Sequence, residues 1–109
     1  MFWLPCARLV KITVWHGDTV TGAITNESVL AAFEAIWSEK IKQPKSTRAT
    51  FRHSLDLQML QGNKYRSTRW LYDSNGFAKV MVIPNLGFHV PVYAIPAPED
   101  LNRLIGIAP

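Results

Sequence analysis

A regular alternation of polar and mostly apolar residues over positions 46–59 constrains this fold more than any other feature. The polar set comprises Ser46, Arg48, Thr50, Arg52, Ser54, Asp56 and Gln58. The mostly apolar set comprises Thr47, Ala49, Phe51, His53, Leu55, Leu57 and Met59. A period of two is that of a β-strand, in which successive side chains point to opposite faces. We therefore predict a strand with one face on a core and the other toward water or a charged partner.

The composition is that of a folded protein. The chain has 109 residues, of which 48% are hydrophobic, and this length fits one domain over residues 1–109. Cys6 is the only cysteine, so no intramolecular disulfide can form, and a reducing compartment is expected. We find no targeting segment and no apolar run near the roughly 20 residues that span a bilayer. These features predict a cytoplasmic protein without a membrane partner.

Two strands and a helix are predicted before the alternating segment. Residues 7–15 are rich in β-branched and aromatic types and end at a His-Gly-Asp turn, and residues 19–24 can pair back on them. Apolar residues at helical spacing predict a helix over residues 27–42, capped by Thr25 or Asn26 and stopped before Pro44.

Gly62-Asn63 predicts a hairpin whose paired residue numbers sum to 125. This register sets Asp56 across from Arg69 and Arg52 across from Asp73, so charges meet opposite charges. On the other face, Leu55 meets Trp70 and His53 meets Tyr72. A slip of one residue would break both matches.

Asn75-Gly76 predicts a second hairpin, with Trp70 against Met81, Leu71 against Val80 and Arg69 against Val82. Strands are then expected over residues 77–83 and 88–95, the latter with Pro91 as an edge or bulge signal. A short helix over residues 99–105 follows, with Pro98 in its first turn and Gly106 as its stop.

These elements predict an α+β fold in which an antiparallel β-meander of four to five strands packs on one long helix, with a short C-terminal helix. The expected core face of the sheet consists of Phe51, Leu55, Leu57, Met59, Trp70 and Met81. If residues 46–61 were helical instead, the order of elements would resemble that of RelE-type ribonuclease toxins. Helical spacing does not gather the apolar residues of this segment on one stripe, and no residue roles are carried over from that resemblance.

Positive charge is concentrated in the middle of the chain. Residues 40–79 hold nine basic and two acidic residues, a net charge of +7, whereas the rest of the chain carries −3. Basic side chains neutralise phosphates and aromatic rings stack on unpaired bases. We therefore predict a non-catalytic accessory protein that binds DNA or RNA. The candidate contacts are Lys45, Arg48, Arg52, Lys64, Arg66 and Arg69.

Two other classes of function stay open. Leu71, Val80 and Val82 share a face with arginines in the predicted register, and such a mixed patch is typical of a homodimer or a partner-binding module. An enzyme is the third class, but no catalytic, metal or cofactor motif is found, so no residues are assigned to those roles. His16, His53 and His89 lie far apart in the sequence, and His16 with Asp18 would be the natural acid–base pair.

Overall fold

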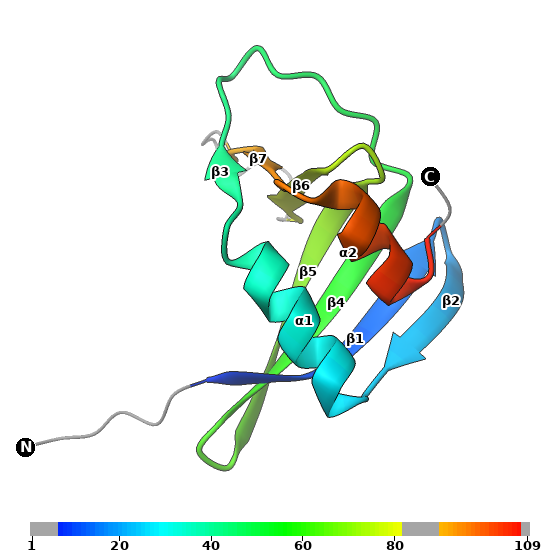
Figure 1. Ribbon diagram of the computed structural model, residues 1–109, viewed down its shortest axis with the longest axis vertical. Coiled ribbons are helices and arrows are strands. Elements are labelled where there is room, and N and C mark those ends of the chain that lie inside the picture. The colour runs from blue at the N-terminus through cyan, green and yellow to red at the C-terminus, as the bar shows by residue number, and fades with distance from the viewer. Residues whose placement is uncertain (1–6, 82–89, 108–109) are drawn as a thin grey trace, which may run out of the picture.

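The computed structural model describes residues 7–81 and 90–107. These residues form seven antiparallel strands and two helices, joined by turns and loops (Figure 1). The strands are β1 (Arg8–His16), β2 (Thr19–Ile24), β3 (Ile41–Lys42), β4 (His53–Gln61), β5 (Lys64–Asp73), β6 (Phe77–Val80) and β7 (Tyr93–Ala94). The helices are α1 (Glu27–Trp37) and α2 (Pro98–Ile105). The strand order is β2-β1-β4-β5-β6-β7-β3. The predicted α+β class is confirmed, but the sheet has seven strands rather than four or five.

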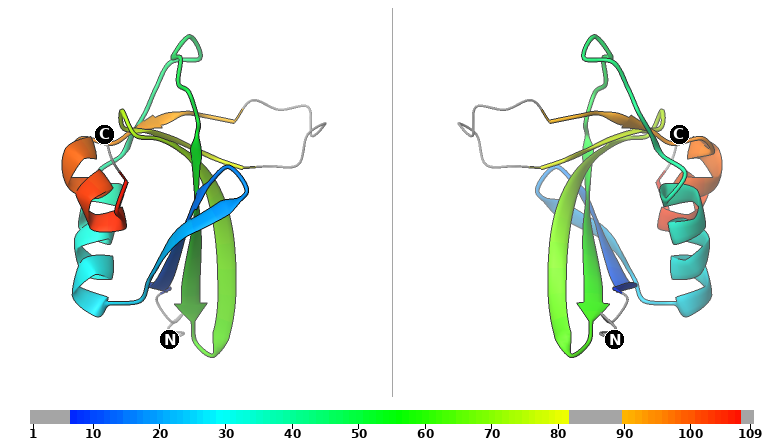
Figure 2. Two further views of the ribbon diagram at one scale, coloured as in Figure 1. Left: turned by 90° about the vertical axis from the view of Figure 1, so that its right-hand side faces the viewer. Right: turned by 90° about the vertical axis from the view of Figure 1, so that its left-hand side faces the viewer.

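Both helices cover the same face of the curved sheet (Figure 2), and the core lies between the helices and the sheet. Ile12 and Val14 of β1 and Leu55 of β4 meet Phe33 of α1 and Leu101 of α2, and all five are fully buried. A buried hydrogen bond from the Tyr72 hydroxyl to Asn102 Oδ1 joins β5 to α2. Neither helix in the described ranges is long and apolar enough to cross a membrane.

The alternating segment forms a strand only from His53 onward. Residues 46–52 precede the ladder, although exposed and half-buried residues still alternate along them. The prediction of a strand beginning at residue 46 was therefore wrong at its start, because the Thr50 N–H bonds to a side chain, the Asp73 carboxylate. Since residues 53–61 are a strand, the helical alternative and its RelE-like order of elements are also wrong.

The first predicted hairpin register is confirmed for residues 53–61, whereas Arg52, expected across from Asp73, precedes the paired strand. His53 pairs with Tyr72, Leu55 with Trp70, and Asp56 with Arg69. This register turns Tyr72 into the core, where it is 0% exposed, and places Trp70 against α1, where its ring meets that of Trp37 at 4.9 Å. From His53 onward, the apolar side of the alternation is thus the helix-covered face. We call the opposite side of the sheet the open face. Phe51, expected in the core, instead lies half-buried beside Lys79, outside the core cluster.

The second predicted register was wrong by one residue. Trp70 pairs with Val80 and Leu71 with Lys79, because the turn has three residues, 74–76, rather than two. Asp73 Oδ1 accepts the Asn75 N–H at 2.9 Å, and Gly76 takes a positive φ of 100°. A slip of one residue exchanges the two faces of a strand.

That slip moves two residues away from their predicted places. Val80 joins the helix-covered face instead of the arginine-bearing face, and Met81 is 43% exposed instead of lying in the core. Val80 is therefore not part of the mixed patch that was expected from Leu71, Val80 and Val82. Val82 lies outside the described residues. The predicted strands 77–83 and 88–95 are partly outside them as well.

The long helix ends at Trp37 rather than at residue 42. Asn26, one of the two predicted caps, caps its start, because its Oδ1 accepts the N–H groups of Ser28 and Val29. At its end, the Lys40 N–H bonds to the Trp37 carbonyl, and Ile41–Lys42 then pair with β7 as β3. Ile41, expected on the buried side of the helix, is 63% exposed. The short C-terminal helix is confirmed, with Pro98 in its first turn and Gly106 at its end.

Candidate nucleic-acid interface

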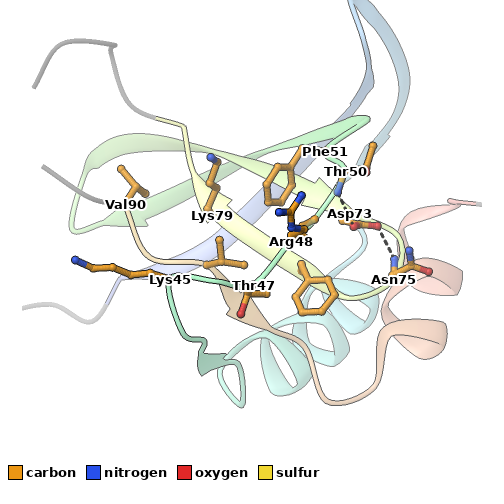
Figure 3. A pocket seen from close by; sticks show the side chains of 12 residues that line it. Lys45, Thr47, Arg48, Thr50, Phe51, Asp73, Asn75, Lys79 and Val90 are labelled. Atoms are coloured by element: carbon orange, nitrogen blue, oxygen red, sulfur yellow. Dashed lines mark hydrogen bonds between the residues drawn. The ribbon is translucent and has the colours of Figure 1, made fainter. Parts of the chain in front are cut away.

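A groove of about 740 Å³ lies between segment 45–51, which precedes β4, and the open face of β6 (Figure 3). Residues 90 and 92, just before β7, complete its wall. Three of its side chains are basic (Lys45, Arg48 and Lys79) and two are aromatic (Phe51 and Phe77). We refer to it below as the basic groove.

Asp73, at the end of β5, anchors the wall of the basic groove. Its Oδ2 accepts the Thr50 N–H at 3.0 Å and its Oδ1 accepts the Asn75 N–H at 2.9 Å. The residue is only 5% exposed, and these two backbone donors compensate a carboxylate that burial would otherwise destabilise. The same carboxylate therefore fixes segment 45–51 and the turn before β6.

Two of the three basic side chains of the groove are exposed to solvent, and the third is half-buried. Lys45 and Arg48 are exposed, and Lys79 is half-buried with Nζ 5.2 Å from the centroid of the Phe51 ring. Within residues 7–81 and 90–107, no carboxylate lies at ion-pair distance from any of the three. In the close-up, Lys45 and Lys79 lie toward one end of the groove and Asp73 and Asn75 toward the other (Figure 3).

The six predicted contact residues lie in different parts of the molecule. Lys45 and Arg48 line the basic groove, and Arg52 lies beside it in a smaller pocket that also includes Thr50. Lys64 and Arg66 pair with Gln61 and Met59 at the far end of β4, whose nine residues span about 30 Å at roughly 3.3 Å each. The predicted single basic region is therefore not one surface.

Arg69 lies on the open face but is engaged inside the protein. Its guanidinium carbon is 4.4 Å from the centroid of the Trp15 ring, and its Nη2 donates to Ser54 Oγ at 3.3 Å. Its Nε, together with Asp56 Oδ1, is buried without a hydrogen-bond partner. Although Asp56 and Arg69 face each other, the expected ion pair does not form, because the arginine turns toward Trp15 on β1.

The second expected ion pair, between Arg52 and Asp73, is also absent from the described part of the chain. Both oxygens of Asp73 are occupied by backbone N–H groups, and Arg52 stays exposed. Arg52 is consequently free to add a positive charge at the edge of the basic groove.

Lys79 is the groove residue that the sequence-based assignment missed. The predicted hairpin paired Val80 with Leu71, and this placed Lys79 on the opposite, apolar side. The observed pairing of Lys79 with Leu71 puts it on the open face. A three-residue turn ending in glycine, which is common in hairpins, is the signal that could have identified it.

His16 and His53 come together where β1 ends and β4 begins. Their rings stack with centroids 4.9 Å apart, and His53 Nδ1 is buried without a hydrogen-bond partner. Burial, followed by the nearby charges of His16 and Arg52, lowers the pKa of His53. Asp18 is exposed in the turn after His16, and His89 lies outside the described residues. No group of three potential metal ligands occurs among the residues that the structure describes.

Comparison with known protein families, with curated proteins and with solved structures finds no match to this chain.

Proposed function

We propose that the protein binds single-stranded nucleic acid in the basic groove. The observation that carries the proposal is the convergence of Lys45, Arg48 and Lys79, all without carboxylate partners among the described residues, on a groove that also contains two phenylalanines. These side chains come from two parts of the chain that Asp73 holds together.

Each kind of side chain has a role in this binding. The lysines and the arginine bind the phosphates of the backbone, which releases counterions. Phe51 and Phe77 offer flat apolar surface to bases, and one stacked base contributes about 1–3 kcal/mol to binding. Bases in a duplex are already stacked on each other, so a groove of this kind favours an unpaired strand.

Direct binding tests the proposal. Fluorescence anisotropy of a labelled oligonucleotide of about 12 nucleotides, within the range of known single-strand site sizes, measures the affinity of the unaltered protein. The variant Arg48→Gln/Lys79→Gln removes two charges from the groove. Lys64→Gln/Arg66→Gln removes two charges from the hairpin tip, so it is a control with the same net charge.

We expect the groove variant to lose at least about tenfold in affinity, since a hydrogen bond to a charged group contributes about 1.5–3 kcal/mol. The tip variant should retain most of the affinity. Equal losses in both variants would mean that only net charge matters, and absence of binding at low salt would contradict the proposal.

A further inference from the structure

On the helix-covered side, Lys40 is surrounded by three aromatic rings. Its Nζ lies 4.9 Å from the ring centroid of Trp37, 5.3 Å from that of Trp70 and 5.7 Å from that of Tyr93. The ammonium also donates to the Trp37 carbonyl at 3.3 Å. Contacts between a cation and ring faces are attractive and hold the group in place, so the position of the positive charge is fixed.

A cavity of about 340 Å³ adjoins this lysine, between α1 and the helix-covered face of the sheet. Apolar side chains dominate its lining, with Leu9, Phe33, Trp37, Leu57, Met59 and Trp70 from four different elements. Its volume and its composition, mostly apolar with few polar groups, match those of small-molecule sites.

The charges around the cavity favour an anionic head group. No carboxylate among the described residues lies at ion-pair distance from Lys40, and burial lowers the pKa of this lysine. An anion bound beside the ammonium would offset that penalty. The acidic residue of the lining, Glu34, accepts the Leu9 N–H of β1 at 2.8 Å. Glu34 is thus held at β1, whereas Lys40 lies beside β5. In the sheet, β4 separates these two strands, and neighbouring strands are about 5 Å apart.

We propose that this cavity binds a small amphipathic carboxylate, such as a medium-chain fatty acid. The apolar body of the ligand packs against Met59 and Trp70, the lining residues that remain partly exposed, and its carboxylate pairs with the ammonium of Lys40. Thr68, two residues before Trp70 on the same strand face, brings a hydroxyl to the lining that can donate to the same carboxylate. This site is on the opposite side of the sheet from the basic groove and does not depend on nucleic-acid binding.

Isothermal titration calorimetry of the unaltered protein with decanoate, decanol and decylamine separates the contribution of the head group from that of the chain. We expect saturable one-to-one binding of decanoate, weaker binding of decanol, and the weakest binding of decylamine. Binding of decanol as tight as that of decanoate, or no saturable binding of decanoate below its micellar concentration, would overturn the proposal.

A pair of variants tests the lysine itself. Lys40→Met keeps an unbranched apolar side chain but removes the charge, and we expect it to weaken decanoate binding at least about tenfold, as for a charge-assisted hydrogen bond. Lys42→Met, at an exposed position outside the cavity, should bind decanoate normally. Equal effects of the two variants would contradict the proposal, and the ligand series remains decisive if Lys40→Met does not fold.

Discussion

The carboxylate of Asp73 accepts a hydrogen bond from the Thr50 N–H, 23 residues earlier in the chain, and this contact holds one wall of the basic groove against the other. A single buried side chain thus connects the stability of the sheet to the shape of the proposed binding site.

The variant Asp73→Ala should therefore lose both stability and binding. It removes the two hydrogen bonds that the buried carboxylate accepts from the N–H groups of Thr50 and Asn75, which costs about 1–3 kcal/mol in the free energy of unfolding. Urea denaturation measures this change, and oligonucleotide binding by the folded variant should also weaken. Asp18→Ala, at an exposed turn, serves as the control and should change stability by less than about 0.5 kcal/mol. Similar values for the two variants would show that Asp73 is not an anchor.

Stability should fall as the pH decreases through the range in which histidine titrates. Because the pKa of His53 is lowered in the folded state, the unfolded chain binds this proton more readily. The contribution of neutral His53 is complete above its unfolded pKa of about 6.5 and declines as the pH falls below that value. Thermal unfolding at about pH 7.5 and pH 5.5 measures the effect, which His53→Gln should reduce. An unchanged pH dependence in that variant would assign the effect to other groups.

Two glycines with positive φ should respond differently to replacement by alanine. At Gly76, φ is 100° and an added Cβ would lie 2.8 Å from the Cβ of Pro98. At Gly17, φ is 60° and no atom lies within 4 Å of an added Cβ. Gly17→Ala should cost about 1–2 kcal/mol from backbone conformation alone, and Gly76→Ala should cost about 1–3 kcal/mol more from the steric clash. Chemical denaturation of both variants compares them, and equal losses would contradict the observed packing of the turn on α2.

The sequence was informative where neighbouring residues decide the structure. The Gly62-Asn63 turn set the pairing of β4 with β5 correctly, because charge and aromatic matches on both faces agree with only one register. The helix cap could be narrowed to Thr25 or Asn26 from residue type and position, and Asn26 is the cap. The core positions Leu55 and Leu57 followed from the alternation itself.

Contacts distant in the sequence decided the rest. The bond from Asp73 to Asn75 makes a three-residue turn where Asn75-Gly76 alone favours two residues, and the resulting slip brings Lys79 into the basic groove. The pairing of Ile41–Lys42 with β7 ends the helix earlier than its apolar spacing indicates. Likewise, the ring of Trp15 on another strand draws Arg69 away from the carboxylate that faces it.

The salt dependence of oligonucleotide binding is the decisive measurement for phosphate contacts in the basic groove. Contacts to phosphates of a single strand lower the logarithm of the binding constant by about 0.7 per phosphate for each unit in the logarithm of salt concentration. With Lys45, Arg48 and Lys79 each bound to one phosphate, we predict a slope of about −2 for the unaltered protein. Arg48→Gln/Lys79→Gln should bring it to about −0.7, whereas Lys64→Gln/Arg66→Gln should leave it unchanged. A slope that is the same in all three proteins, or that changes only in the tip variant, would contradict binding in the basic groove.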